Sequence, residues 1–281
     1  MMSSGVHGGQ VPDRPDAVTL GAMTLTVQWP EFVDTAALRE HERMRLMEEV
    51  FDPFSIANLD RIGVRAGWRC LEVGAGGGSI ARAMADRAGG ANVVATDLSI
   101  RLLGPLTDLG VTVLRHDVTA DEAPGEFDLI HARFVLDHLP GRDAALARMA
   151  SWLRPGGWLL LEVGSTAPEL SSRPEVAAAM AAGNAVLAGQ LGTHTSWART
   201  MPLPLSAAGL SDCAAVGQAV AVRGGGPMAR WLKETYSLVD DRVVAAGLMS
   251  RDGLDQAYAA MADPSFVDYT WLTVAATGRR N

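Results

Sequence analysis

The sequence predicts an α/β protein in which helices cover both faces of one doubly wound sheet. From Trp68 onward, short apolar runs alternate with amphipathic stretches of helical period, and a glycine-rich turn follows the first of these runs. At 281 residues the chain is long enough for one large domain, or for one domain with a small appendage. Hydrophobic residues make up 48% and charged residues 20%, which is the composition of a folded protein.

Charge and composition argue against several classes of partner. The formal net charge is -8, so the chain has no basic footprint for a nucleic-acid backbone. No apolar run reaches about 18 residues, the length that predicts a membrane-spanning helix. The opening residues lack the charged start and apolar stretch of a secretory signal. We therefore expect a cytoplasmic protein that binds neither nucleic acid nor membrane.

The first part of the chain is expected to be an arm followed by helices. Residues 1–17 are rich in Gly, Ser, Pro and Asp and have no hydrophobic period, which is typical of a flexible terminus. From Glu31 to Ile62, apolar residues recur at helical spacing. We expect two helices there, separated at Pro53, with Ser55 as the N-cap of the second. Residues 18–63 are thus predicted to form an N-terminal helical cap.

A parallel sheet flanked by helices is predicted for residues 64–164. Helices are expected at Ser79–Ala88, Ile100–Leu109 and Arg142–Leu153, and the RPGG segment at Arg154–Gly157 indicates a helix stop before the next strand. Strands separated by helices of this length are typical of a parallel sheet. The five strands are expected at WRCLEV, NVVATD, VTVLRH, FDLIHA and GWLLLEV.

After Gly164 the regular alternation ends. Residues 165–211 are a Pro-punctuated, mostly helical stretch, which we interpret as a lid that carries part of the substrate site. Residues 212–281 are expected to complete the sheet with a strand at Asp212–Val222 and a final strand within FVDYTWLTVAATG. The predicted sheet therefore has seven strands. The helices between the last two are expected near Met228–Ala246 and Asp252–Met261.

The glycine-rich turn in CLEVGAGGGS predicts a ligand site, because ligands of open α/β sheets bind beyond the carboxyl ends of the strands. Gly74, Gly76 and Gly78 follow a GxGxG spacing, whereas a dinucleotide fingerprint is GxGxxG, and Ser79 stands in place of its third glycine. Glu72 precedes the turn, where a carboxylate suits a positively charged ligand better than a diphosphate. A cationic ligand is favoured, with an ordinary tight turn as the alternative.

Acidic residues end the next two predicted strands. Asp97 is placed to accept hydrogen bonds from both hydroxyls of a ribose, and Asp117 to accept one from the exocyclic amine of adenine. Each residue also has a structural interpretation. Asp97 can cap the helix that begins near Ser99, Asp117 can be a turn residue, and Leu98 can belong to the core.

Five motifs follow one another between residues 68 and 163: LEVGAGGGS, VVATDLS, RHDVTA, FDLIHARFVLDHLP and LRPGGWLLLEV. In this order they resemble the core of class I S-adenosylmethionine-dependent methyltransferases. The series is also similar to natural-product methyltransferases of actinobacteria, and WLTVAATGRR is similar to the antiparallel closing strand of that group. The resemblance implies a Rossmann-like, mostly parallel seven-stranded sheet with an antiparallel last strand, and substrate choice by residues 1–60 and 165–225.

The same resemblance implies S-adenosylmethionine as the cofactor and assigns residues to it. Gly74 and Gly76 would pass beneath its methionine portion, Asp97 would hold the ribose, and Leu98 would pack on the adenine. The full implied set of cofactor contacts is Glu72, Gly74, Gly76, Gly78, Asp97 and Leu98, with Asp117 and Val118 at the adenine edge and His131 and Arg133 near the sulfur.

A general base is expected if the methyl acceptor is a hydroxyl, whereas a neutral amine is already nucleophilic. In LDHLP, Asp137 and His138 stand where related small-molecule methyltransferases often carry two histidines. Histidine, with an ordinary pKa of about 6.5, suits this role, and an adjacent acid can fix its tautomer or act as the base itself. His194 is the alternative base if the lid folds over the site, and a structural role for His138 is the other interpretation.

The expected reaction is methyl transfer to an oxygen of a small, partly apolar metabolite, with natural-product intermediates favoured by the resemblance. A nitrogen acceptor, a non-catalytic cofactor-binding regulator and a Rossmann-type nicotinamide or nucleotide-sugar enzyme are the alternatives. No metal is expected, because the sequence has no compact Asp/Asn cluster for a hard cation. A homodimer is left open. The candidate apolar wall residues for the acceptor are Met180, Trp197, Met201 and Trp231.

Overall fold

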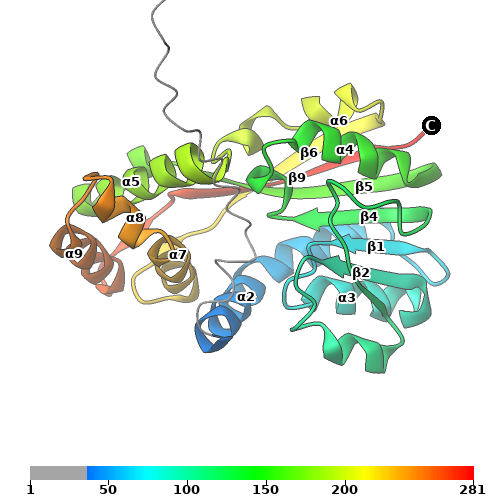
Figure 1. Ribbon diagram of the computed structural model, residues 1–281, viewed down its shortest axis with the longest axis horizontal. Coiled ribbons are helices and arrows are strands. Elements are labelled where there is room, and N and C mark those ends of the chain that lie inside the picture. The colour runs from blue at the N-terminus through cyan, green and yellow to red at the C-terminus, as the bar shows by residue number, and fades with distance from the viewer. Residues whose placement is uncertain (1–36) are drawn as a thin grey trace, which may run out of the picture.

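The computed structural model describes residues 37–281 and is built around a seven-stranded sheet (Figure 1). The strand order is β3-β2-β1-β4-β5-β9-β6, in which β9 runs antiparallel to both neighbours and the other pairs are parallel. This arrangement confirms the predicted fold class. The strands of the sheet are β1 (Cys70–Val73), β2 (Val93–Asp97), β3 (Thr112–Arg115), β4 (Phe127–Arg133), β5 (Leu153–Thr166), β6 (Ser211–Ala219) and β9 (Trp271–Arg279).

Helices cover both faces of the sheet. In Figure 1, α3 (Ser79–Ala88) lies on one face, and α4 (Arg142–Ser151) and α6 (Leu203–Ala207) lie on the other. Successive residues of β5 point into the two cores: Leu160 packs in the cluster that includes α3, whereas Leu161 packs in the cluster that includes α4. Burial of both faces explains why the strands appear in the sequence as almost continuous apolar runs.

Among the described residues, one helix, α2 (Ala37–Ile62), precedes the sheet, and it passes through Pro53. The predicted break at Pro53 and restart at Ser55 is therefore wrong. Proline lacks the N–H that would bond the carbonyl four residues back, but burial against the sheet outweighs this loss. Leu59 is fully buried, and the buried Ser55 hydroxyl donates a hydrogen bond to the carboxylate of Glu162 on β5. The expected arm at 1–17 and the start of the expected N-terminal helices at 18–63 lie outside the described residues.

Four helices form a layer beyond the carboxyl ends of the parallel strands (Figure 1), and we call this layer the helical cap. It consists of α5 (Pro174–Leu191), α7 (Pro227–Ser237), α8 (Asp240–Ala245) and α9 (Arg251–Ala262). Helix α5 lies in the stretch interpreted as a lid. The other three lie between β6 and β9, in the stretch predicted to complete the sheet. Helix α2 packs against α7. This side of the molecule is therefore built by the start of α2 and by two insertions, one that carries α5 and one that carries α7, α8 and α9.

Several helix and strand boundaries differ from the predicted ones, mostly at segments that contain proline or glycine. The expected helix at Ile100–Leu109 is a 3₁₀ helix at Gly104–Leu109, because a proline at position 105 disfavours α conformation in the residue before it. The RPGG segment lies inside β5 rather than before it, and the pairing of β4 with β5 is irregular there. The last two predicted strands each divide, and the short pieces Val222–Arg223 (β7) and Val267–Asp268 (β8) pair with each other.

Candidate active site

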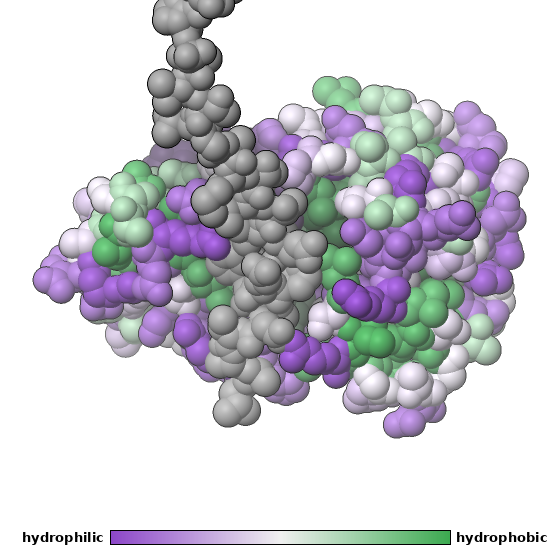
Figure 2. Space-filling model, viewed as in Figure 1, coloured by the Kyte–Doolittle hydropathy of each residue, from purple (hydrophilic) through white to green (hydrophobic). Residues whose placement is uncertain are grey.

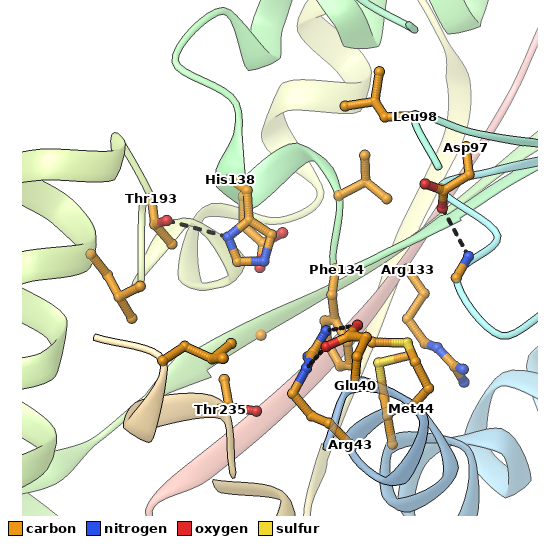
Figure 3. A pocket seen from close by; sticks show the side chains of 18 of the residues that line it. Glu40, Arg43, Met44, Asp97, Leu98, Arg133, Phe134, His138, Thr193 and Thr235 are labelled. Carbon is orange, nitrogen blue, oxygen red and sulfur yellow. Dashed lines mark hydrogen bonds and ion pairs between the residues drawn. The ribbon is translucent and has the colours of Figure 1, made fainter. Parts of the chain in front are cut away.

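A cavity of about 370 Å³ lies between the carboxyl ends of β1 to β4 and the helical cap. Figure 2 shows hydrophobic residues in the recess between the sheet half and the helical half. In Figure 3, Asp97 and Leu98 lie toward one end of the cavity, and Thr193 and Thr235 lie toward the other. His138 stands between these ends. This is the position at which open α/β sheets bind ligands.

The glycine turn after β1 forms one wall of the cavity. Gly74, Gly76 and Gly78 all have positive φ angles, of 68°, 56° and 87°, which side-chain-bearing residues rarely adopt. Gly74 also has no room for a side chain, because a Cβ there would lie 2.3 Å from Cγ2 of Val135. Gly74 and Gly76 line the cavity. Gly78 lies outside the wall, at the start of α3, where it packs against Leu106.

Asp97 ends β2 at the cavity and joins two backbone segments. Its Oδ2 accepts a hydrogen bond from the Gly76 N–H at 2.9 Å, and its Oδ1 accepts one from the Ser99 N–H at 3.0 Å. The carboxylate therefore fixes the glycine turn and still faces the cavity (Figure 3). Leu98 is 39% exposed and lines the same end, so it is an apolar surface at the cavity rather than a core residue.

Asp117 and Val118 follow β3 and complete this end of the wall. Asp117 Oδ1 accepts hydrogen bonds from the Thr119 N–H at 2.8 Å and from the Thr119 hydroxyl at 2.6 Å. Asp117 is therefore a turn residue that also faces the cavity, so its two interpretations are compatible. Val118 is buried and adds apolar surface beside Leu98. This end of the cavity is thus apolar, with carboxylates at two strand ends.

Glu72 and His131 do not line the cavity, in contrast to the expectation for both. They pair directly across β1 and β4, so both side chains point to the same face of the sheet, and that face is covered by α2. His131 is fully buried, with Nδ1 2.6 Å from Glu72 Oε2 and Nε2 3.5 Å from Glu162 Oε2. Burial opposes its charge, but the two carboxylates prevail and raise the pKa of His131 to about 9.

Arg133 ends β4 and reaches the cavity wall. Its Nη1 donates to Asp52 Oδ1 and to the Ser55 hydroxyl, both at 2.9 Å. Asp52 also accepts a hydrogen bond from the Ser79 hydroxyl at 3.0 Å. This network ties α2 to the first turn of α3 and holds a positive charge beside the glycine turn.

Asp137 and His138 follow β4 and lie in the cavity wall. His138 Nδ1 is 3.2 Å from the Thr193 hydroxyl (Figure 3). Burial is the main cause that lowers the pKa of His138, so the neutral ring is favoured. Asp137 is 5% exposed, and its Oδ1 has no hydrogen-bond partner among the described residues. His194 is exposed and lies outside the wall, although its N–H donates to the Asp137 backbone oxygen at 2.7 Å.

Sequence reasoning missed the contribution of α2 to the wall. Glu40, Arg43 and Met44 all face the cavity (Figure 3). Arg43 donates two hydrogen bonds to the Glu40 carboxylate, from Nε at 2.9 Å and from Nη2 at 2.7 Å. The spacing of three and four residues, which places side chains on one side of a helix, was a signal for this face. A partly buried ion pair and a thioether therefore border the cavity, and the thioether lies beside Gly76.

An aromatic wall, formed by Phe134, Trp231 and Trp271, faces the cavity between the strand ends and the cap. The ring centroids of Trp231 and Trp271 are 5.0 Å apart, and those of Phe134 and Trp271 are 5.8 Å apart. Phe134 has a φ of 54°, which is unusual for a bulky residue and is typical of functional sites. Trp231 was an expected wall residue, whereas the other three, Met180, Trp197 and Met201, pack in the cores.

Within residues 37–281, no group of three or more His, Cys, Asp or Glu side chains is arranged to hold a metal ion. In the same range, no helix is both long and apolar enough to cross a membrane. The site is thus described by its carboxylates, its histidine and its aromatic wall.

Fold and cavity together define a Rossmann-like α/β protein whose site lies at the carboxyl ends of its strands. The profile of a family described as "Methyltransferase domain" matches residues 29–205, which is more than half of the chain. The chain therefore belongs to the methyltransferase-domain family, whose class of enzymes takes the methyl group from S-adenosylmethionine.

Curated relatives are similar over part of their length. The ubiquinone biosynthesis O-methyltransferase of Aromatoleum aromaticum is 36% identical over 114 residues, which cover 38% of this chain and 48% of that protein. The enzyme of the same name from Dechloromonas aromatica is 33% identical over 126 residues, covering 42% of this chain and 53% of that protein. The chain thus matches about half the length of these relatives.

Solved structures share the fold. Phosphoethanolamine N-methyltransferase 2 of Haemonchus contortus, in complex with S-adenosyl-L-methionine, has a TM-score of 0.58 at 18% identity, covering 91% of this chain and 60% of that chain. The YcgJ protein of Bacillus subtilis has a TM-score of 0.56 at 15% identity, covering 81% of this chain and 98% of that chain. At these identities the likeness shows the fold alone.

Proposed function

We propose that this enzyme transfers the methyl group of S-adenosylmethionine to a hydroxyl oxygen of a small, largely apolar metabolite, such as a natural-product intermediate. One observation carries the proposal: a single cavity brings a carboxylate and apolar surface suited to a nucleoside together with a half-buried histidine whose neutral form is favoured. Asp97 and Leu98 stand at one end of this cavity and His138 stands nearer the other (Figure 3).

The residues at the strand ends fit the cofactor. Asp97 offers carboxylate oxygens to the two ribose hydroxyls, and Leu98 and Val118 offer apolar surface to the adenine. Gly74 and Gly76 let the backbone approach the methionine portion, and the positive charge of Arg133 suits its carboxylate. Glu72 is bonded to His131 behind the wall, so we assign it a supporting role rather than direct contact with the cofactor.

S-adenosylmethionine supplies an electrophilic methyl group, so the protein must mainly align the acceptor, exclude water and remove a proton. Burial lowers the pKa of His138, which keeps the ring able to accept the hydroxyl proton at neutral pH. Thr193 contacts Nδ1 and holds the ring orientation. Asp137, buried beside it, stabilises the imidazolium that forms, since its charge raises the pKa of His138.

An oxygen acceptor is favoured over nitrogen because a base at this position accelerates proton removal from a hydroxyl. The curated relatives described above carry the name O-methyltransferase, and this supports the same choice. The aromatic wall and the methionine of α2 favour a partly apolar acceptor. We also propose that the helical cap, together with the rest of the predicted lid at residues 165–211, forms the acceptor end of the site.

The proposal is tested by incubating the protein with methyl-labelled S-adenosylmethionine and a panel of phenols, aliphatic alcohols and amines. We expect label in the phenols. His138→Gln should lower turnover by about 10²- to 10⁴-fold, the usual contribution of a general base. His194→Gln is the matched control, because this histidine lies outside the cavity wall. Wild-type turnover in His138→Gln, or label only in the amines, would contradict the proposed oxygen chemistry.

Two further proposals concern the cellular location of the protein and its oligomeric state. We propose a cytoplasmic protein without a nucleic-acid partner, and the formal net charge of -8 supports the second part of this proposal. A homodimer is a prediction that light scattering of the purified protein tests. Neither alters the assignment of the cavity.

A further inference from the structure

The acceptor end of the cavity has an aromatic surface, in which Trp271 packs edge to face with Phe134 and Trp231, and its surroundings hold it in place. Phe51 packs behind the aromatic wall, with its ring centroid 4.9 Å from those of both Phe134 and Trp231. Gly164 on β5 leaves space for Trp271, since a Cβ at Gly164 would lie 2.4 Å from Cζ2 of that ring. A wall built in this way favours a planar, apolar ligand, because aromatic faces and edges pack best against another ring.

Two polar atoms of α7 interrupt this apolar surface without partners of their own. Thr235 Oγ1 and Trp231 Nε1 are both buried, and neither has a hydrogen-bond partner among the described residues. Both residues line the cavity, and in Figure 3 the Thr235 side chain lies toward its cap end. Residues four apart share one side of a helix, so the two groups are neighbours. Leaving such groups unpaired is unfavourable unless a ligand or water meets them.

The neighbouring polar groups of the cap are already paired. The Tyr236 hydroxyl donates to Asn184 Oδ1 at 2.8 Å, and Asn184 Nδ2 donates to the Thr166 hydroxyl at 2.8 Å. The Thr193 hydroxyl is engaged with His138 Nδ1. Among the described residues of α7 that line the cavity, Thr235 and Trp231 thus have buried polar atoms without a partner, and an indole N–H can only donate. Their complement is a ligand oxygen that accepts hydrogen bonds.

We propose that the acceptor end of the cavity selects a flat aromatic molecule that carries a second oxygen besides the one that is methylated. Thr235 is the specificity-determining residue for that second oxygen. This inference rests on the proposed function, because the proposed function places the hydroxyl that is methylated beside His138. The ring lies against the aromatic wall. The Thr235 hydroxyl donates a hydrogen bond to a carbonyl oxygen on the far side of the ring, and Trp231 Nε1 faces the same region.

Binding of matched ligand pairs tests this assignment without requiring turnover. The ortho, meta and para hydroxyacetophenones carry a ketone where the corresponding ethylphenols carry a methylene, so each pair differs in one oxygen. Affinities are measured by calorimetry with S-adenosylhomocysteine bound. We expect at least one ketone to bind about three- to tenfold more tightly than its ethylphenol, the range of one hydrogen bond. In Thr235→Val, a change of similar size that removes the hydroxyl, this difference should disappear.

Two further variants separate the hydrogen bond from packing. Thr235→Ser keeps the hydroxyl and should retain the ketone preference, and Thr112→Val, on the exposed surface of β3, should leave it unchanged. Thr235→Ala replaces the valine variant if that variant does not fold. The assignment is overturned if no isomer shows a ketone preference, or if the preference survives in the variant that lacks the hydroxyl. Ketone preference without methylation of any phenol would instead contradict the proposed function and leave the Thr235 assignment standing.

Discussion

Replacing Asp97 by alanine tests the cofactor end of the cavity most sharply. In the proposed complex the carboxylate accepts hydrogen bonds from two ribose hydroxyls. A hydrogen bond to a charged group contributes about 1.5–3 kcal/mol, so two contribute about 3–6 kcal/mol. At about 1.4 kcal/mol per factor of ten, Asp97→Ala should weaken binding of S-adenosylhomocysteine by about 10²- to 10⁴-fold.

The same variant also removes two backbone contacts, because Asp97 accepts hydrogen bonds from the N–H groups of Gly76 and Ser99. Each of these is also a hydrogen bond to the charged carboxylate and contributes about 1.5–3 kcal/mol, so the free energy of unfolding should fall by about 3–6 kcal/mol. Asp97→Asn keeps one oxygen acceptor and should fall between wild type and Asp97→Ala in both properties. Asp108→Ala, an exposed carboxylate in the 3₁₀ helix after β2, is the matched control.

Titration calorimetry with S-adenosylhomocysteine measures the affinity, and urea unfolding measures the stability. A dissociation constant for Asp97→Ala within threefold of wild type would refute the ribose assignment. A loss of affinity in Asp108→Ala of the same size would show that charge alone, rather than the position of the carboxylate, accounts for the effect.

Three further predictions follow from the site and its supporting network. Because burial lowers the pKa of His138 from 6.5, kcat/KM should begin to fall only below pH 6.5, and a fall that begins above pH 6.5 would contradict its role as base. The pKa of His131 is raised from 6.5 to about 9, so its contribution to the free energy of unfolding is complete below pH 6.5 and is lost as the pH rises through 9. Urea midpoints that do not decrease between pH 6.5 and 9.5 would be inconsistent with this. In Gly164→Ala the new methyl group displaces Trp271, so KM for the acceptor should rise while the affinity for S-adenosylhomocysteine stays unchanged. An unchanged KM would contradict the role of the aromatic wall in binding the acceptor.

The sheet and its cofactor end were predictable because local pattern specifies them. An apolar run, a glycine turn and an amphipathic helix make one strand-turn-helix unit, and the carboxyl ends of parallel strands meet at one edge. The positions of Asp97, Leu98 and Asp117 follow from that geometry. Helix α3 also begins and ends at the predicted residues, because Gly78 and Gly89 bound an uninterrupted helical pattern.

The buried side of the site was not predictable from residue type alone. Glu72 and His131 lie close to the carboxyl ends of neighbouring strands, and the motifs that contain them placed both near the cofactor. Their shared register sends both side chains to the face beneath α2, and the sequence does not reveal which helix covers that face. The continuity of α2 through Pro53 is part of the same effect, because tertiary burial there outweighs the local tendency of proline to end a helix.

The acceptor end was also beyond sequence reasoning. Phe134, Thr235 and Trp271 belong to a strand end, a cap helix and the last strand, and only the chain fold brings them to one wall. Insertions between strands vary in length and direction, and periodicity gives no information about where they return. The positive φ of Phe134 is likewise a property of the folded chain, since phenylalanine has no local preference for it.

A crystal structure of the protein grown with S-adenosylhomocysteine tests the account most directly. We predict adenine against Leu98 and Val118, both ribose hydroxyls within hydrogen-bond distance of Asp97, and the sulfur facing the side of the cavity that holds His138. An empty cavity at saturating ligand, or a ligand bound elsewhere on the chain, would contradict the assignment on which every other prediction depends.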